Sequence, residues 1–321
     1  MNIFDGHTDI PADIVEKRQQ GEEQVMRRYH WEKLQQGGIT AANFALWLEP
    51  GKTGADTLEQ ALVYLQDELI QISAECRVVH CLQDFKQAQE QHQMALVMGM
   101  EGLSAIGEDL SWMSRLYEAG MRCASLTWNE ENHLATGVEG SVGRGLTTKG
   151  REVVRFMESQ GMLLDVSHLN EASFWDVLKI TTKPVMASHS NAWSLCRHPR
   201  NLKDDQIKAI GASGGVIGVN AWPDFLHERH PDLAHYVEQI DYLVNLIGVE
   251  QVALGFDFCD FLPPDPHKDP EEILETSGLE NVTAAGNVLT QLKQRGYSSE
   301  ALEKIAYGNF EGLYGKVLPQ T

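Results

Sequence analysis

The chain has 321 residues, of which 42% are hydrophobic, and 46 acidic against 26 basic residues give it a formal net charge of −20. This length is enough for one large α/β domain with a sizeable core. An acidic surface repels phosphate backbones and anionic lipid headgroups, so we expect neither nucleic-acid binding nor binding to a membrane surface.

Strands and helices are predicted to alternate along the whole chain. Apolar runs typical of a parallel sheet covered on both faces predict strands at Ile3–Phe4, Ile39–Leu48, Ala95–Met100, Arg122–Thr127, Met162–Val166, Pro184–Ala187, Gly215–Val219 and Val252–Phe256, with a further short strand at Val78–Leu82. Polar or amphipathic stretches predict helices in 12–36 and at 58–72, 84–92, 109–118, 147–160, 171–180, 203–210 and 233–247. Two more helices are predicted after the last strand, near 281–294 and 299–306.

This rhythm predicts the fold class. About eight strand–helix alternations favour an α/β protein of the (β/α)8 TIM-barrel type, with inserted loops and extra C-terminal helices. The sequence has no G-x-G-x-x-G after its first strand, which argues against a dinucleotide-binding fold. No interdomain linker is visible, and the proline-rich stretch 263–266 is expected to be a surface loop. We therefore expect residues 1–321 to form a single barrel domain.

Candidate metal ligands follow the predicted strands. His7 and Asp9 are two positions apart, a spacing that places both side chains on the same face of a strand. Later strands end in further groups of this kind, namely Glu101, His168, His189 and Asp257. Each residue alone has an ordinary explanation as a cap, a loop residue or a turn former. Because the carboxyl ends of barrel strands share one face, the set together predicts a metal site.

The donor types predict a two-metal hydrolytic site. His7 and Asp9 would hold one ion. His168 and His189 would hold the other, with Glu101 bridging the two. Two cations about 3.5–4 Å apart can share a hydroxide that attacks a carbonyl, and they also polarise the carbonyl oxygen. Nitrogen and oxygen ligands with several imidazoles favour two Zn²⁺ per chain, with Mn²⁺ or Co²⁺ as substitutes.

Asp257 follows the last predicted strand and is not needed as a metal ligand in this assignment. A carboxylate there would orient the bridging hydroxide, take its proton and deliver it to the leaving amine.

Six stretches of the sequence match one known family. They are DGHTDIP at 5–11, GMEG at 99–102, DVSH at 165–168, ASHSNA at 187–192, PRN at 199–201 and GFDF at 255–258. In this order and spacing the chain resembles the membrane (renal) dipeptidase family of the amidohydrolase superfamily, along nearly its whole length, as a soluble member of the bacterial type. The resemblance implies a binuclear zinc barrel with a ligand set of His7, Asp9, Glu101, His168 and His189.

The same resemblance implies roles for two further residues. Asp257 would be the general acid/base, and Arg200 would bind the terminal carboxylate of the substrate. A guanidinium pairs bidentately with a carboxylate, so such an arginine would explain a preference for dipeptides over longer peptides. A D-residue at the C-terminal position of the dipeptide is within the expected range.

The chain departs from the family at two positions. Trp128 stands where studied members have a His that contacts the substrate carbonyl. Trp has one N–H donor and no titratable group, so stabilisation of the oxyanion would come from the metal, from Asn129 or His133, or from the indole. We predict Trp128 and Asn129 as substrate-binding residues. Cys259 stands where the family often has Asp. A reduced Cys that lines the site is one interpretation, and a small buried hydrophobe is the role that we expect.

The sequence also predicts a location. It has no segment in the order of a signal peptide, no apolar run of about 18 residues or more, and five cysteines without a CxxC pair. We expect reduced thiols in a cytoplasmic protein.

The function we predict is a zinc-dependent dipeptidase that uses a metal-bridging hydroxide on small dipeptide substrates. A homodimer is expected from related enzymes. Two alternatives stay open: an amidohydrolase that acts on N-acyl amino acids or other small amides, and a catalytically silent metal-binding barrel.

Overall fold

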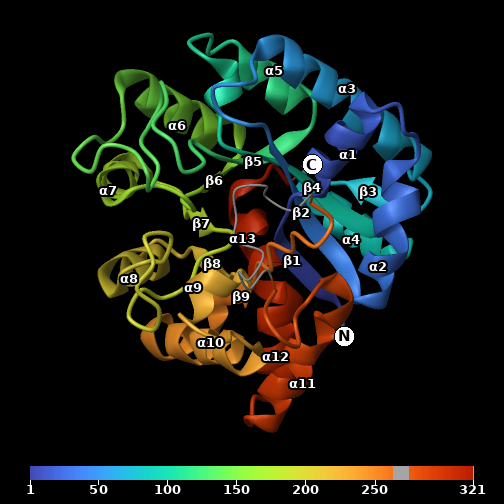
Figure 1. Cartoon of the computed structure of the whole chain (residues 1–321), viewed down its shortest axis with the longest axis vertical. Helices are drawn as coiled ribbons and strands as arrows, with labels where there is room; N and C mark the ends of the chain where they lie inside the picture. The colour runs from blue at the N-terminus through green and yellow to red at the C-terminus, as the bar shows by residue number, and fades with distance from the viewer. Residues whose placement is uncertain (263–274, 321) are drawn as a thin grey trace.

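The computed structural model describes residues 1–262 and 275–320, and the loop expected at 263–266 lies outside the described residues. Eight parallel strands form a closed barrel with helices around it (Figure 1). The ring is closed by β2 against β4, with Ala41 opposite Ala95 and Trp47 opposite Glu101. Its strands, in chain order, are β1 (Ile3–Thr8), β2 (Ile39–Trp47), β4 (Met94–Glu101), β5 (Met121–Ser125), β6 (Leu163–Asp165), β7 (Met186–Ala187), β8 (Val216–Val219) and β9 (Val252–Leu254). The predicted TIM barrel is confirmed.

A ninth strand, β3 (Cys76–Val78), pairs with the first residues of β4. The strand predicted at Val78–Leu82 is therefore shifted toward the N-terminus. The physical reason is a helix start, since the Asp84 carboxylate accepts the backbone N–H groups of His80 and Cys81 and the next helix begins at Leu82.

The helices lie outside the ring of strands (Figure 1). Their bounds are α1 (Ile10–Gln19), α2 (Trp31–Gln36), α3 (Ala55–Gln71), α4 (Leu82–Glu90), α5 (Trp112–Glu118), α6 (Thr148–Gln160), α7 (Glu171–Ile180), α8 (Asp204–Ala212), α9 (Pro223–Leu226), α10 (Leu233–Ile247), α11 (Gly286–Gln294), α12 (Ser299–Glu303) and α13 (Asn309–Val317). Short π-helical turns occupy Met26–His30 and Lys304–Gly308. Short 3₁₀ turns occupy Ser104–Ile106, Val249–Gln251 and Val282–Ala284. Within the described residues, none of these helices combines the length and the apolar character that crossing a bilayer requires.

The last helix, α13, was not predicted, and it closes one end of the barrel. Figure 1 shows it in the middle of the ring of strands. Its buried Phe310 and Tyr314 pack on the Phe4 ring inside the barrel, at centroid distances of 5.4 and 5.8 Å. A Cβ at Gly6 would lie 2.5 Å from the Phe310 ring, so the glycine of the DGH motif is needed for this close approach. With this end filled by aromatic side chains, the opposite end, where the strands terminate, is left for a site.

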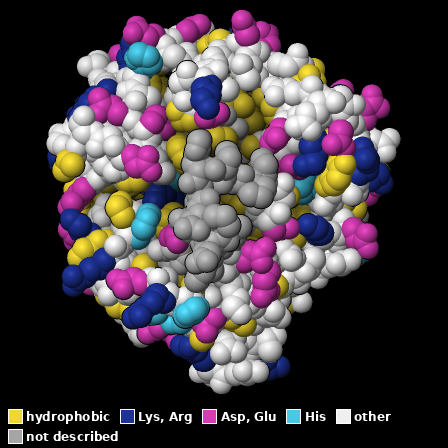
Figure 2. Space-filling model, in the orientation of Figure 1, with side chains coloured by type: hydrophobic (Ala, Val, Ile, Leu, Met, Phe, Trp, Pro, Cys, Tyr) yellow, Lys and Arg dark blue, Asp and Glu magenta, His cyan; other side chains and the backbone are white. Residues whose placement is uncertain are grey.

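The face of the molecule seen in Figure 2 carries Asp and Glu side chains interspersed with Lys and Arg. On this face the charges of the chain, whose net charge is −20, are of both signs.

Candidate metal and active site

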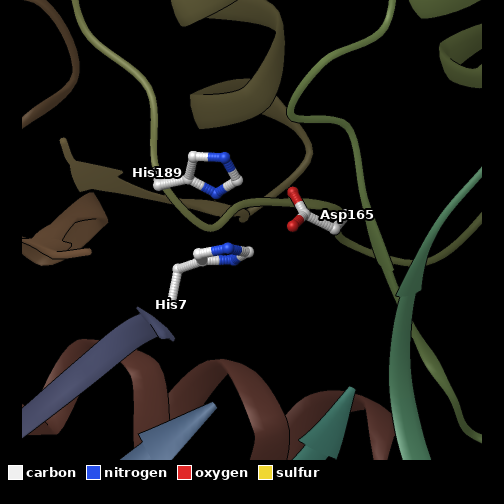
Figure 3. A group of neighbouring side chains, drawn as sticks. All are labelled: His7, Asp165 and His189. Atoms are coloured by element: carbon white, nitrogen blue, oxygen red, sulfur yellow. The ribbon is translucent and has the colours of Figure 1, made fainter. Parts of the chain in front are cut away.

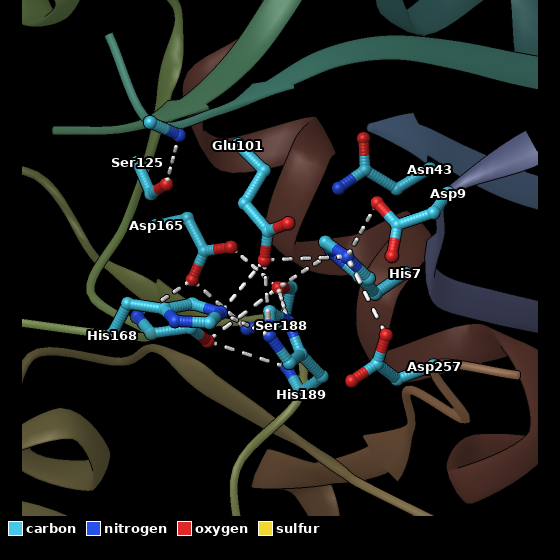
Figure 4. Close-up of polar contacts among 12 residues, drawn as sticks. His7, Asp9, Asn43, Glu101, Ser125, Asp165, His168, Ser188, His189 and Asp257 are labelled. Atoms are coloured by element: carbon cyan, nitrogen blue, oxygen red, sulfur yellow. Dashed lines mark hydrogen bonds and ion pairs between the residues drawn. The ribbon is translucent and has the colours of Figure 1, made fainter. Parts of the chain in front are cut away.

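The predicted ligands converge at the carboxyl ends of the strands, as Figure 4 shows. Glu101, the last residue of β4, lies between three imidazoles. Its Oε1 is 2.7 Å from His168 Nε2, 3.3 Å from His189 Nε2 and 3.5 Å from His7 Nε2. A single carboxylate oxygen thus faces the Nε2 atoms of three imidazoles that lie on or just beyond three other strands.

Two carboxylates complete the cluster on the β1 side. His7 Nε2 is 3.6 Å from Asp9 Oδ1 and 3.9 Å from Asp257 Oδ1. The ligand atoms of His7, Asp9 and Glu101 lie within 4.8 Å of one another, and the same holds for Glu101, His168 and His189. Glu101 therefore belongs to two candidate metal-binding groups at once.

The residues present fit a metal ion. His7 Nε2 and Asp9 Oδ1 are buried and have no hydrogen-bond partner among the described residues. A buried polar atom without a partner costs about 1–3 kcal/mol, and a cation between these two atoms would satisfy both. Imidazole nitrogens and carboxylate oxygens at this spacing are the donor set of zinc and similar divalent ions.

The protonation states of the imidazoles also fit a metal site. Burial, with Arg200 and His7 nearby, lowers the pKa values of His168 and His189 well below their ordinary values, so both imidazoles are neutral and keep a lone pair. Burial alone would lower the pKa of His7 too, but Glu101 and Asp9 outweigh it and raise that pKa well above its ordinary value. The carboxylates of the cluster thus hold a positive charge in place, a role that a bound cation would take over.

Two of the site residues have an unusual backbone. His168 has φ +70° and Asp257 has φ +60°, in the left-handed region that side chains other than glycine rarely adopt. Such conformations cluster at functional sites because the surrounding structure must hold them. Here they occur just beyond β6 and β9, where the chain turns each side chain into the mouth of the barrel.

A buried carboxylate and a hydroxyl that were not predicted orient two of the imidazoles. Asp165 Oδ1 accepts the backbone N–H groups of Ser167 and Ser188 at 2.9 and 3.0 Å. Ser188 donates its O–H to Asp165 Oδ2, and its oxygen lies 2.7 Å from His189 Nδ1 and 3.4 Å from His7 Nδ1. Because the hydroxyl proton goes to Asp165, the hydroxyl oxygen accepts Nδ1–H, which leaves Nε2 of the ring free to bind a metal.

Figure 3 shows Asp165 beside His7 and His189, whose ring centroids are 3.8 Å apart. These three residues could also be grouped as metal ligands by distance. Both oxygens of Asp165 are already engaged by N–H and O–H donors, however, so we interpret Asp165 as a positioning residue. The DVSH and ASHSNA stretches contained the signal for Asp165 and Ser188, but adjacency in sequence did not reveal which groups meet.

A second buried carboxylate, Asp5, links the first strand of the chain, β1, to the segment that follows its neighbour β9, the last strand. Its Oδ1 accepts the N–H of His7 at 3.2 Å and that of Phe256, two residues beyond β9 and directly before Asp257, at 3.0 Å. Burial raises the pKa of Asp5 to about 7. Asp5 thereby fixes the backbone of His7 and the backbone that leads to Asp257 on two neighbouring strand ends.

Asp257 faces the ligands with one oxygen and is held by the other. Asn220 Nδ2 donates to Asp257 Oδ2 at 3.0 Å, while Oδ1 points toward His7. Burial, with Asp9 and Glu101 nearby, raises the pKa of Asp257 to about 8. A carboxyl group whose pKa lies near neutrality is suited to taking and giving a proton.

Arg200 lies beside the cluster and is only 4% exposed. Its Nη2 donates to the backbone carbonyl of His189 at 3.4 Å, and its Nε has no hydrogen-bond partner in the described part of the chain. Burial lowers the pKa of Arg200, against the opposing influence of Glu101 and Asp257. A buried guanidinium with a free donor can accept an anionic group of a ligand.

Asn129 lies behind His168, away from the position expected of a substrate contact. Its Oδ1 is 2.8 Å from His168 Nδ1, and its Nδ2 donates to Glu139 Oε1 at 3.2 Å. Both amide atoms are therefore engaged in orienting the ligand and its loop. Substrate binding by Asn129 stays a prediction.

Trp128 forms part of the wall next to the site. Its ring meets Trp47 edge to face at 5.5 Å and lies 6.1 Å from the His168 ring. The structure does not bring His133 into the cluster, because that side chain is 56% exposed and faces Glu108 at 3.8 Å.

Cys259 lies closer to the site than expected. Its Sγ can be grouped within 4.8 Å of carboxylate oxygens of Asp9 and Asp257. Burial, with these carboxylates nearby, raises the pKa of the thiol well above its ordinary value, so it is a neutral thiol at the edge of the cluster.

Comparisons with known proteins find a family whose model matches almost the whole chain. The model of the family described as membrane dipeptidase (peptidase family M19) matches residues 1–317. The chain is 34% identical over 266 residues to an uncharacterised protein from the region 5′ of pqqA in Klebsiella pneumoniae. The aligned region covers 79% of this chain and 94% of that relative. The chain is also 30% identical over 304 residues to an uncharacterised dipeptidase of Schizosaccharomyces pombe. That aligned region covers 88% of this chain and 68% of the relative.

A similar fold has been solved in a metallopeptidase from Rhodobacter sphaeroides, in complex with a phosphinate mimic of the dipeptide L-Ala-D-Ala. The TM-score is 0.86 at 22% identity, over 99% of each chain. At this identity the match supports the fold.

Proposed function

Since the chain belongs to the membrane dipeptidase family, peptidase family M19, we propose that it is a dinuclear zinc dipeptidase. The observation that carries this proposal is the position of Glu101, whose carboxylate belongs to both candidate ligand groups. A carboxylate shared by both groups could bind a pair of metal ions a few ångströms apart, the arrangement of two-metal hydrolytic sites.

The proposed ligands are divided between two ions. His7 and Asp9 would hold one, His168 and His189 would hold the other, and Glu101 would bind both. When bound, the pair of ions polarises the substrate carbonyl and lowers the pKa of an attacking water molecule. Zinc is favoured by three imidazoles combined with carboxylate oxygens.

The chain's own residues supply the proton transfer. Asp257 Oδ1 faces the ligand group and its Oδ2 is fixed by Asn220, so the free oxygen would take a proton from the attacking water. The same carboxyl group would then deliver the proton to the departing amine. A pKa of about 8 supports both steps near neutral pH.

Arg200 would select for substrates with a carboxylate close to the scissile bond. A buried guanidinium with a free Nε supports this role, because pairing with a carboxylate would complete its hydrogen bonds. A free carboxylate one residue beyond the scissile bond defines a dipeptide. The metallopeptidase of similar fold that was solved with a mimic of L-Ala-D-Ala motivates including D-residues at the C-terminal position.

A substrate panel with zinc-loaded protein tests the proposal. We expect hydrolysis of dipeptides with L- or D-residues at the C-terminal position, and much weaker hydrolysis of N-acetyl and N-formyl amino acids and of amidated dipeptides. Turnover of N-acyl amino acids without turnover of dipeptides would favour the related amidohydrolase instead. Binding of less than one equivalent of zinc after reconstitution would contradict the two-metal assignment.

A further inference from the structure

Two asparagines in the stretches that match the family have no role in the proposed chemistry. Asn191 lies two residues after the proposed ligand His189, and Asn201 directly follows the proposed anchor Arg200. Their exposed fractions are 0% and 5%, so both amides are buried. Buried polar groups in proteins are almost always hydrogen-bonded, and the partners of these amides show which parts of the site they hold in place.

The Asn191 side chain pairs with the backbone just beyond β8. Its Oδ1 accepts the N–H of Asn220 at 2.9 Å, and its Nδ2 donates to the carbonyl of the same residue at 3.0 Å. One amide thus engages both backbone polar groups of Asn220, as a paired strand would. It continues the contact between β7 and β8, in which the N–H of Ser190 donates to the carbonyl of Gly218 at 2.8 Å. The position of the Asn220 backbone therefore depends on Asn191.

Asn220 in turn holds Asp257. Its Nδ2 donates to Asp257 Oδ2 at 3.0 Å, and its Oδ1 accepts the backbone N–H of Trp222. Because a backbone N–H can only donate and an ionised carboxylate can only accept, the amide is fixed in this orientation. Asp257 has a left-handed φ of +60°, which its surroundings must hold. The direction of Asp257 Oδ1 toward the ligand cluster (Figure 4) therefore depends on Asn220, which is fully buried.

A second set of contacts leads from Asn191 to Arg200. Asn191 Nδ2 also donates to the Phe225 carbonyl at 3.2 Å, and Asn201 Nδ2 donates to the same oxygen at 2.9 Å. One carbonyl of α9 thus joins the loop of His189 to the loop of Arg200. The Phe225 ring faces the guanidinium, with Arg200 Cζ 5.5 Å from the ring centroid. A cation is attracted to the face of an aromatic ring, so Phe225 supports the proposed anchor.

We infer that Asn191 is a positioning residue that holds Asp257 and Arg200 in a fixed relation to each other. Through Asn220 it sets the direction of the proton-transfer carboxyl, and through the Phe225 peptide it sets the support of the guanidinium. The inference rests on the proposed dipeptidase function, in which the distance between the carboxylate anchor and the proton donor has to fit one dipeptide. Misplacement of a reacting group by about 1 Å can cost about 10²-fold in rate.

The test measures kcat and KM of zinc-loaded variants on L-Ala-L-Ala and L-Ala-D-Ala. Asn220→Ala removes the contact to Asp257 and should lower kcat about tenfold or more, with KM within about twofold. Phe225→Leu removes the ring beside Arg200 but keeps the carbonyl, and should raise KM about fivefold with kcat within about twofold. Asn191→Ala should lower kcat and raise KM together. Adding Asn220→Ala to Asn191→Ala should lower kcat little further, because both act on the same carboxyl.

Asn309→Ala is the matched control. Asn309 is 7% exposed, and its Nδ2 donates to the backbone carbonyls of Val249 and Val252 at 2.7 and 2.8 Å. It thus holds backbone carbonyls as Asn191 does, but Val252 is the first residue of β9, at the end of the barrel opposite the site. Asn309→Ala should lower the unfolding temperature and leave kcat and KM of the zinc-loaded protein unchanged.

At full zinc content, a change in only one of kcat and KM in Asn191→Ala, or in neither, would overturn the inference and leave the dipeptidase function intact. If Asn191→Ala does not fold, the other two variants decide. Unchanged kcat in Asn220→Ala, or unchanged KM in Phe225→Leu, would also overturn the inference. Failure of the unmodified protein to hydrolyse any dipeptide would overturn the proposed function as well.

Discussion

Removing the Ser188 hydroxyl should weaken the binding of both metal ions. Ser188 Oγ lies 2.7 Å from His189 Nδ1 and 3.4 Å from His7 Nδ1, and these two imidazoles are assigned to different ions. In Ser188→Ala, His189 Nδ1–H and Asp165 Oδ2 lose their partner inside a site where Ser188 itself is fully buried.

The size of the effect follows from these lost contacts. A buried polar group left without a partner costs about 1–3 kcal/mol. Loss of a hydrogen bond behind a metal ligand lowers metal affinity by about 10–100-fold, which corresponds to about 1.4–2.7 kcal/mol per ion. We expect a loss in this range for the His189 ion, through the 2.7 Å contact, and a smaller loss for the His7 ion, through the longer one.

The assay is a competition titration of Zn²⁺ against a chelator, fitted with two binding constants. Asn129→Ala is the matched comparison, since Asn129 contacts His168 at 2.8 Å and should weaken one ion only. Ser190→Ala is the control, because the Ser190 hydroxyl contacts the Ser167 hydroxyl at 3.4 Å rather than the imidazole of a proposed ligand. Unchanged affinity for both ions in Ser188→Ala would refute the reasoning, as would a loss that is explained entirely by lower stability of the metal-free protein.

Three further predictions concern the proton donor, the anchor and a buried acid. Asp257→Asn should lower kcat by about 10²–10⁴-fold with little change in zinc content, measured by steady-state kinetics and metal analysis, and near-normal kcat would contradict the proton-transfer role. Arg200→Lys should raise KM by about tenfold or more, because an ammonium loses the bidentate geometry, and equal effects on dipeptides and amidated dipeptides would speak against a carboxylate contact. Asp5→Asn should stabilise the metal-free protein above neutral pH. The pKa of Asp5 is raised to about 7 in the fold, so the folded state holds a proton that the unfolded state releases. Asp5 therefore contributes a loss of about 1.4 kcal/mol of stability per pH unit as pH rises from about 4 to 7, and Asp5→Asn removes this contribution. Thermal unfolding of both proteins at pH 4 and pH 8 checks this, and an equal difference at both values would be inconsistent with it.

The sequence predicted the barrel and the ligand types because both are encoded locally. A continuous apolar run is a sufficient signal for a strand covered on both faces, and β4 is buried along its whole length as expected. The spacing of His7 and Asp9 places both on one face of β1 by the geometry of a strand alone. Once a parallel barrel is assumed, its strand ends must share one face, which is why Glu101, His168, His189 and Asp257 could be grouped.

The contacts that complete the site could not be predicted in this way. Asp5 accepts an N–H from Phe256, 251 residues away, and Asp165 accepts the Ser188 hydroxyl from 23 residues away. Such hydrogen bonds depend on which strands are neighbours and in what register, and a local pattern does not contain this information. The left-handed backbone conformations of His168 and Asp257 could not be predicted from the sequence for a related reason. Only the surrounding packing can hold a residue other than glycine in that conformation.

By itself, then, the sequence determined the succession of strands and of most helices up to α12, the donor groups at the strand ends and the family. The tertiary structure decided what those groups do together. Closure of β2 on β4 brings Glu101 between the two ligand sets, α13 fills the opposite end of the barrel with Phe310 and Tyr314, and the Asn191 amide pairs with the backbone of Asn220. Each of these depends on distances between segments that are far apart in the chain, and such distances exist only in the packed molecule.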